Sequence, residues 1–160
     1  MPEDIRLPLT RQGFDRIAVE LKRLKEVDRP AIIKAIGEAR ALGDLSENAE
    51  YHAARERQGW IEALIRKHED TLARAEVIDP AKLAGSKVRF SATVTLQDEE
   101  RGTEHRYQIV GEEEADNEQG RLSLRSPLGR ALIGHEEGDD VEVRAPGGVR
   151  HYTILQVEYV

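Results

Sequence analysis

Two carboxylates three residues apart, Asp44 and Glu47, are the residues of this sequence best suited to chemistry. They lie in a short polar run, Gly43–Asn48, between two long stretches with helical patterning. Two exposed carboxylates at this spacing can share one hard cation, and magnesium in proteins is commonly held by one or two carboxylates together with phosphate and water. Alone, we expect such a pair to bind the ion weakly.

The same two residues also have a simpler structural interpretation. Asp44-x-x-Glu47 has the spacing of a capping box, in which the first side chain accepts an amide N–H of the new helix and the second reaches back. Both charges would favour the positive N-terminal end of that helix. Spacing alone favours capping, whereas the position between two long helices favours chemistry. The two roles are compatible, because one carboxylate has lone pairs for both an amide and a metal.

Other catalytic arrangements are weak in this sequence. The five histidines are scattered without the spacing of metal ligands, and the absence of cysteine excludes disulfides and thiolate zinc sites. There is no glycine loop of the phosphate-binding kind and no nucleophile elbow, and Gly147–Gly148 reads as a turn. The sequence therefore predicts no self-contained active site.

The stretch before the tip predicts one long helical arm. Thr10 is a suitable N-cap, and Gly43 suits the position just past the helix end. Pro30 lacks an N–H and predicts a kink or a restart, with a break into two helices as the alternative. Apolar residues recur at spacings of three and four, the pattern of one buried helical face: Phe14, Ile17, Leu21, Leu24, Ile32, Ala35, Ile36, Ala39 and Leu42.

A second helical pattern runs from Ala49 to about Glu76. Two helices of this length joined by so short a turn must be antiparallel. At about 1.5 Å per residue the first arm would reach roughly 48 Å. We expect Ala49 and Ala53 to face the small residues of the first arm, and Trp60 to lie in the hairpin core. The tip would then be the narrow end of a probe.

From Val88 onward the period changes to two, which is typical of strands. Further strand candidates are centred on Tyr107–Ile109, Leu122–Leu124, Val141–Val143 and Tyr152–Tyr159. Ser126 and Pro127 fit the N-cap and first position of a short helix. We therefore predict an α+β protein with an antiparallel helical hairpin in residues 1–79 and a mainly antiparallel sheet with one short helix in residues 80–160.

Composition restricts the partners. The 160 residues carry a formal net charge of -7, whereas a protein that binds nucleic acid by charge alone normally has a basic face. The N-terminus does not resemble a signal peptide. No apolar run approaches the roughly 18 residues of a membrane span. We expect a cytoplasmic protein without a membrane partner.

The run Ala35–Glu56 closely resembles the bacterial Gre family of transcript-cleavage factors, and the acidic total is closer to the GreA than to the more basic GreB type. The resemblance covers almost the whole chain. It continues in the linker Val77-Ile78-Asp79 and in the short-helix segment Ser126–Gly134. In the sheet it is carried by Tyr107-x-Ile109-Val110-Gly111 and Glu114-Ala115-Asp116.

The resemblance implies a coiled-coil hairpin that enters the secondary channel of RNA polymerase and an FKBP-like domain that docks on the channel rim. The factor would not be an enzyme itself. It would stimulate the polymerase to cleave the 3′ end of backtracked RNA, so that arrested elongation resumes. By matching position, Asp44 and Glu47 would help to hold the second Mg²⁺ of the polymerase active site. The protein alone would bind no cofactor and no stable small-molecule ligand.

The resemblance also suggests roles for four other residues. Arg40 and Arg55, within a few turns of the tip, are candidates for contact with the displaced nascent RNA. Ser126 and Pro127 lie in the segment that the family uses for polymerase docking.

Three rival functions remain open at this point. A binding-only homologue would occupy the same channel without stimulating cleavage, although the intact Asp44–Asn48 pattern argues against it. A prolyl isomerase would need an aromatic pocket, for which the C-terminal half offers Phe90, Tyr107, Tyr152 and Tyr159. A structural coiled-coil adaptor would leave the tip acids replaceable.

Overall fold

The computed structural model describes residues 6–43 and 47–160, and these fall into two compact units. One comprises residues 14–75. The other combines residues 76–160 with residues 6–13, so that it is formed by two separate segments of the chain. The expected division at 79–80 did not include this N-terminal segment in the second unit. Within the described residues no helix is long and apolar enough to cross a membrane.

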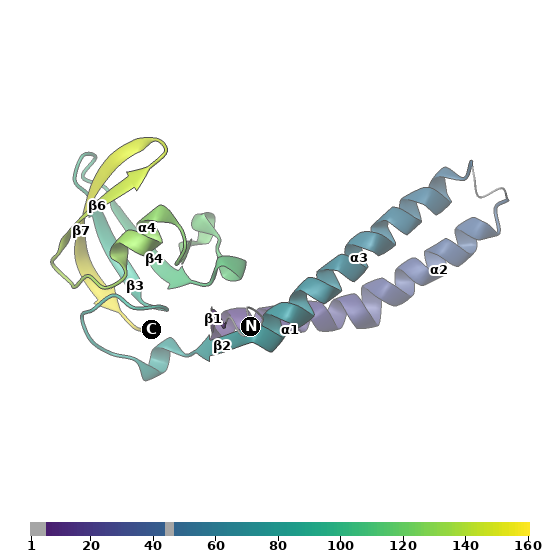
Figure 1. Ribbon diagram of the computed structural model, residues 1–160, viewed down its shortest axis with the longest axis horizontal. Helices are drawn as coiled ribbons and strands as arrows, with labels where there is room; N and C mark the ends of the chain where they lie inside the picture. Colours follow the sequence, from purple (N-terminus) through teal and green to yellow (C-terminus); the bar gives the residue numbers. More distant parts are fainter. Residues whose placement is uncertain (1–5, 44–46) are drawn as a thin grey trace. The chain divides into compact units, whose positions relative to one another are not determined.

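The first arm of the hairpin is a helical run with one wider turn. α1 (Arg11–Arg23) leads into the π-helical turn η2 (Leu24–Asp28), and α2 (Arg29–Arg40) follows without interruption (Figure 1). The Arg29 N–H donates to the Leu24 carbonyl, five residues back, which is the bonding pattern of a π turn. Pro30 lies in the first turn of α2. The helix therefore continues past the proline, because it widens where the ring would otherwise meet a carbonyl.

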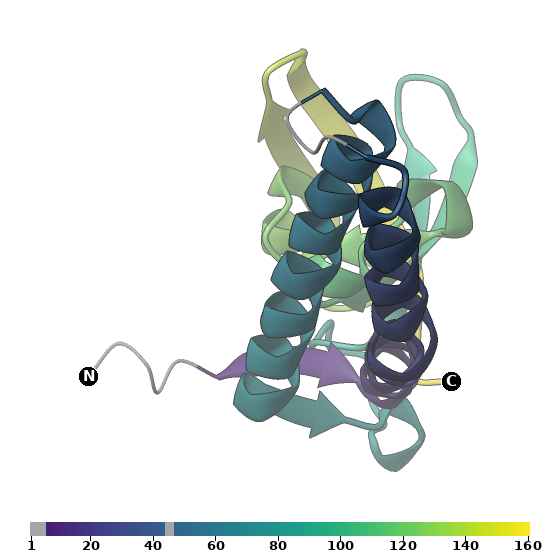
Figure 2. The ribbon, with the colours of Figure 1, turned by 90° about the vertical axis from the view of Figure 1, so that its right-hand side faces the viewer.

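The second arm, α3 (Ala49–Arg74), runs antiparallel to the first (Figures 1 and 2). Contacts between the arms show this order, because the residue number rises in one arm as it falls in the other. Lys25 Nζ lies 3.1 Å from a Glu69 oxygen, and Arg29 forms two 2.8 Å hydrogen bonds with Glu62. The core between the arms consists of Leu24, Ile32, Ile36, Ile61 and Ile65. The predicted helical hairpin is confirmed.

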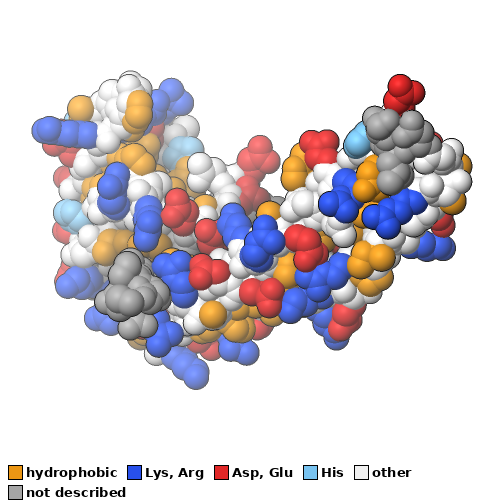
Figure 3. Space-filling model, turned by 45° about the vertical axis from the view of Figure 1, so that its right-hand side comes forward, with side chains coloured by type: hydrophobic (Ala, Val, Ile, Leu, Met, Phe, Trp, Pro, Cys, Tyr) orange, Lys and Arg blue, Asp and Glu red, His pale blue; other side chains and the backbone are white. Residues whose placement is uncertain are grey.

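One detail of the predicted hairpin packing is wrong, because Trp60 is 67% exposed and does not lie in the core. Ala53 borders a groove together with Ala35 and Ala39 of the first arm, as predicted, although Ala49 and Ala53 are both exposed. The physical reason is the phase of α3. Spacings of four fit both Trp60–Leu64 and Ile61–Ile65, and the second pair faces the first arm. Figure 3 accordingly shows hydrophobic side chains among the charged ones on the surface of the hairpin.

α3 ends earlier than its pattern predicts, and a short strand follows. β2 (Ala75–Ile78) pairs with β1 (Leu7–Thr10) in a two-stranded sheet. The residues around Glu76, which were expected to end the helix, are therefore extended. A 3₁₀ turn, η3 (Pro80–Lys82), follows after Asp79.

A five-stranded sheet forms the centre of the second unit, in the order β5-β4-β3-β7-β6. Its neighbours pair antiparallel except β4 and β5, which are parallel. The predicted α+β class with a mainly antiparallel sheet is confirmed. The strands are β3 (Thr93–Asp98), β4 (Glu104–Val110), β5 (Arg121–Ser123), β6 (Asp140–Ala145) and β7 (Gly148–Glu158).

One short helix packs on this sheet. α4 (Pro127–Leu132) contributes Leu132 to the core and packs Leu128 and Ala131 against it. The four aromatic residues considered for an isomerase pocket, Phe90, Tyr107, Tyr152 and Tyr159, are partly buried and pack against the same core. Two 3₁₀ turns, η4 (Glu112–Glu114) and η5 (Asn117–Gln119), connect β4 with β5.

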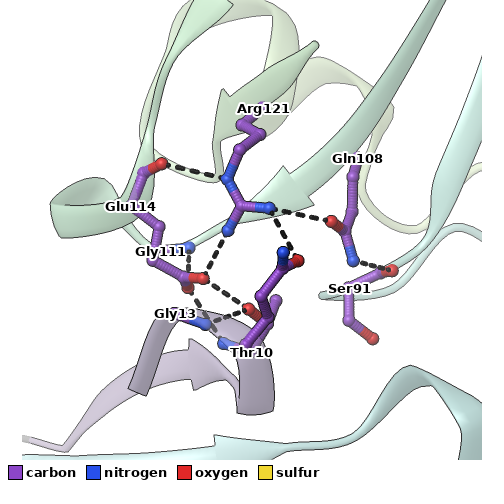
Figure 4. A network of polar contacts seen from close by, with 8 residues as sticks. Thr10, Gly13, Ser91, Gln108, Gly111, Glu114 and Arg121 are labelled. Atoms are coloured by element: carbon purple, nitrogen blue, oxygen red, sulfur yellow. Dashed lines mark hydrogen bonds and ion pairs between the residues drawn. The ribbon is translucent and has the colours of Figure 1, made fainter. Parts of the chain in front are cut away.

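A buried charge network ties residues 6–13 to the sheet (Figure 4). The Glu114 carboxylate accepts the Thr10 backbone N–H at 2.9 Å, the Gly111 N–H at 3.1 Å and the Thr10 hydroxyl. Arg121 donates to the same carboxylate at 2.8 Å, and the side chains of Glu114 and Arg121 are only 1% and 8% exposed. The hydroxyl oxygen of Thr10 also accepts the Gly13 N–H at 3.0 Å. This bond confirms Thr10 as the cap of α1.

Candidate functional site

The tip of the hairpin is built by the end of α2 and the start of α3. α2 ends at Arg40, and the chain passes through Gly43 at a φ of 127°, a backbone conformation that glycine adopts without steric cost. Asp44 lies outside the described residues. Description resumes at Glu47, whose side chain is exposed.

Asn48, and not Asp44, is the N-cap of α3. Its backbone is extended, and its side-chain oxygen accepts the Tyr51 N–H at 3.0 Å. The expected capping box of Asp44 and Glu47 is therefore wrong for the helix that begins at Ala49. The signal was present in the sequence, because asparagine is a preferred N-cap and here directly precedes the alanine at which the helical pattern starts.

The Asn48 side chain also contacts the other arm. Its amide nitrogen donates to the carbonyl of Ala39, in the last turn of α2, at 2.6 Å. One side chain thus caps α3 and binds the end of α2. Sequence reasoning missed this second bond, since no pattern within either helix predicts a contact between them.

Arg40 makes a further contact across the tip. Its guanidinium carbon lies 5.9 Å from the centre of the Tyr51 ring, within the range of a cation–π interaction. Tyr51 in turn packs against the core between the arms. Arg40 remains exposed, and its position is set by the first turn of α3.

Arg55 lies about two turns into α3 and is exposed. Figure 3 shows Lys and Arg side chains gathered toward the tip end of the hairpin. The described part of the tip therefore presents the exposed carboxylates of Glu47 and Glu50 together with the guanidinium groups of Arg40 and Arg55. Among the described residues, no three His, Cys, Asp or Glu side chains come together as metal ligands.

Comparison with known proteins decides the family. Residues 7–77 match the model of the transcription elongation factor N-terminal domain, GreA_GreB_N, and residues 83–159 match that of the GreA/GreB C-terminal domain. The chain belongs to the GreA/GreB family of transcription elongation factors. The predicted resemblance is confirmed.

Relatives match over nearly the full length. "Transcription elongation factor GreA" of Phenylobacterium zucineum is 60% identical over 97% of this chain and 99% of its own. The protein of the same name from Caulobacter vibrioides is 59% identical over the same shares. Among solved structures, that of GreA factor homolog 1 (Gfh1) of Thermus thermophilus is 28% identical and covers 96% of this chain and 99% of its own, with a TM-score of 0.44.

The second GreA/GreB domain contains the two residues expected to dock on polymerase. Ser126 is the N-cap of α4: its hydroxyl oxygen accepts the Gly129 N–H at 3.0 Å and donates its own proton to the Ser123 carbonyl at 2.7 Å. The Ser126 side chain is therefore occupied within the fold, while Pro127 beside it is exposed. Ser126 stabilises the start of α4, and Pro127 is the one of the two residues that is exposed for contact with a partner.

Proposed function

We propose that this GreA/GreB-family chain binds RNA polymerase, enters its secondary channel with the hairpin and stimulates cleavage of the 3′ end of backtracked RNA. The chain is not the catalyst in this proposal. The polymerase carries out the cleavage, and the hairpin tip supplies groups that its active centre lacks. Family membership supports the role in elongation, and the tip geometry supports the more specific step.

One observation carries the proposal. The hydrogen bond that begins α3 comes from Asn48, so the Glu47 carboxylate is not needed as a cap and stays exposed beyond the helix. A residue retained only for helix capping would be engaged with the backbone. Glu47 is instead presented at the narrow end of a hairpin whose second arm, at about 1.5 Å per residue, is roughly 39 Å long.

A shared magnesium ion fits these residues. Glu47 offers hard oxygen atoms in an exposed position, and Asp44, three residues earlier in the sequence, would supply a second carboxylate. When bound between factor and polymerase, the ion would supply activation of water and neutralisation of the leaving oxygen. The role of this chain is to deliver the carboxylates and to hold them in a fixed direction.

The geometry also supports the remaining assignments of this proposal. Arg40, oriented by the Tyr51 ring, and Arg55 carry positive charge toward the displaced RNA. In the second unit, we assign the polymerase contact to Pro127, because the Ser126 hydroxyl is already bonded to Ser123 and Gly129.

Cleavage in a purified backtracked elongation complex with magnesium tests this function. We expect the wild-type protein to shorten the transcript from its 3′ end, and Glu47→Ala or Asp44→Ala to lower the cleavage rate by at least about 100-fold without weakening binding in a competition assay. Since Asn48 caps the helix, Glu47→Ala should change the free energy of unfolding by less than about 0.5 kcal/mol.

The matched control is Glu50→Ala, which removes one exposed carboxylate from the first turn of α3. It should cleave like the wild type. Cleavage by Glu47→Ala at the wild-type rate would contradict the proposed role of Glu47. A wild-type protein that binds polymerase and never shortens the transcript would identify a binding-only homologue.

A further inference from the structure

We propose that Asn48 is the positioning residue of the tip: its side chain fixes the geometry of Glu47 by joining the end of α2 to the start of α3. This inference rests on the proposed function, since it concerns how the carboxylate is aimed. It assigns to Asn48 a role distinct from helix capping.

The first half of the argument is the bond to α3. The Asn48 oxygen accepts the Tyr51 N–H at 3.0 Å, and the Asn48 backbone has a φ of -84° and a ψ of 99°. This bond fixes the residue directly after Glu47 relative to α3. A serine, threonine or aspartate could serve the same purpose.

The second half is the bond to α2. The Asn48 amide nitrogen donates to the Ala39 carbonyl at 2.6 Å. Ala39 is only 4% exposed, so the acceptor belongs to a well-packed turn of the first arm. The two ends of the tip segment are thereby joined through a single side chain, in addition to the contact of Arg40 with the Tyr51 ring.

Asparagine is the side chain that meets both demands at this position. The cap needs an acceptor, and an added bond to the Ala39 carbonyl, which already accepts the Leu42 N–H at 3.1 Å, needs a donor. The planar amide carries one of each at fixed separation. Aspartate has no donor and would direct a charged oxygen at the carbonyl. Serine is too short to reach across while it caps. The residue type is therefore explained by the bond between the arms and not by the cap alone.

The consequence concerns the carboxylate of Glu47. A carboxylate that completes a metal site in another protein must already have the right orientation when the two proteins bind. Loss of a residue that orients a metal ligand typically lowers activity or metal affinity by about 10- to 100-fold. Without the bond to Ala39, the backbone entering Asn48 would be anchored on the α3 side only.

The critical variant is Asn48→Ser, which keeps a capping oxygen and removes the bond to Ala39. Asn48→Ala removes both bonds, and Asn117→Ser makes the same chemical change at an exposed residue of the second unit. Each variant is examined by circular dichroism, by ¹⁵N relaxation of the Glu47 amide, and by transcript cleavage across a magnesium titration with binding measured separately.

For Asn48→Ser we expect wild-type helicity and polymerase binding, cleavage slowed by about 10- to 100-fold, and a higher magnesium concentration at half-maximal rate. The order parameter of the Glu47 amide should fall from about 0.85, the value of ordered backbone, toward 0.6. Asn117→Ser should match the wild type in every measurement.

Two results would overturn the inference. One is an unchanged Glu47 order parameter together with wild-type cleavage at every magnesium concentration. The other is a loss of helicity in Asn48→Ser as large as that in Asn48→Ala, because capping alone would then explain the residue. Absence of cleavage by the wild type would instead contradict the proposed function, and the relaxation measurement would still decide whether Asn48 orders the tip.

Discussion

Gly13 shows how one residue without a side chain permits a buried ion pair. A Cβ atom at this position would overlap the Glu114 carboxylate, including the oxygen that contacts Thr10 and Arg121. The Glu114 side chain cannot move aside easily, because Glu114 and its partner Arg121 are both buried. Glycine is thus required here by close approach, and not by its backbone conformation.

We predict that Gly13→Ala destabilises the protein by about 3 kcal/mol or more, because displacement of Glu114 leaves a buried charge without its partner. Urea unfolding monitored by circular dichroism measures the change. Gly37→Ala is the matched control, since its added Cβ meets nothing within 4 Å inside α2. There the same substitution should stabilise by up to about 1 kcal/mol. Equal effects of the two substitutions would refute the steric argument.

At the scale of elements, the turn between β3 and β4 depends on Asp98. Burial opposes ionisation of this residue, but the backbone N–H groups of Arg101 and Glu100 and the charge of Arg150 outweigh it and hold the pKa of the Asp98 carboxyl below its usual value. Asp98 lies 2.9 Å from the Glu100 nitrogen and 3.2 Å from that of Arg101. The ionised side chain therefore stabilises the turn.

A lowered pKa in the folded state means that this stabilisation is present above the unfolded pKa of about 3.9 and disappears as the pH falls through the lower folded value. We predict that Asp98→Asn lowers the melting temperature at neutral pH, and that its curve converges with the wild-type curve below about pH 4. Glu100→Gln, which removes a charge from the same turn, is the control. A constant difference between Asp98→Asn and wild type down to pH 2 would exclude this explanation.

The two arms of the hairpin and the larger sheet could be predicted from the sequence, because periods of 3.6 and 2 separate them cleanly, whereas the short strands β1 and β2 were not predicted. The sequence did not predict which face of α3 is buried, nor which residues of the two arms contact each other. Trp60 and Ile61 both fit a helical face, and only packing against Leu24 and Ile32 selects Ile61. Pro30 indicated that the first arm is irregular, but it did not indicate a π turn, because a π turn has no sequence pattern of its own. The role of Asn48 depends on Ala39 in the other arm, which is a contact between elements and not a local preference.

For the whole molecule, the second unit is discontinuous in sequence. Thr10, in the segment of residues 6–13, donates two hydrogen bonds to the carboxylate of Glu114, which lies in the segment of residues 76–160. β1 and β2 pair in one small sheet, which brings the two segments of the second unit together. The hairpin, residues 14–75, is in this sense an insertion into the second unit.

We predict that a variant with a short Gly-Ser linker in place of residues 14–75 is more stable to urea than residues 76–160 alone, by about 3 kcal/mol, because only the former retains both bonds from Thr10 to Glu114. Thr10→Val in the linked variant removes the hydroxyl and should cancel part of the gain. Equal stability of the linked and isolated forms would show that the N-terminal segment is dispensable.

The wide turn η2 has a consequence for the direction of the tip. Its bonds close over five residues instead of four, so the first arm contains one residue more than a regular α-helix would need at that place. Each residue advances a helix by about 100°. If the same residues wound as a regular α-helix, everything beyond them, including Ala39, would turn by roughly a quarter of a revolution about the axis of the arm. The wide turn therefore keeps the two parts of the first arm in phase. A change that closed it without removing a residue would misdirect Glu47, whereas deletion of one residue together with the wide turn would leave its direction nearly unchanged.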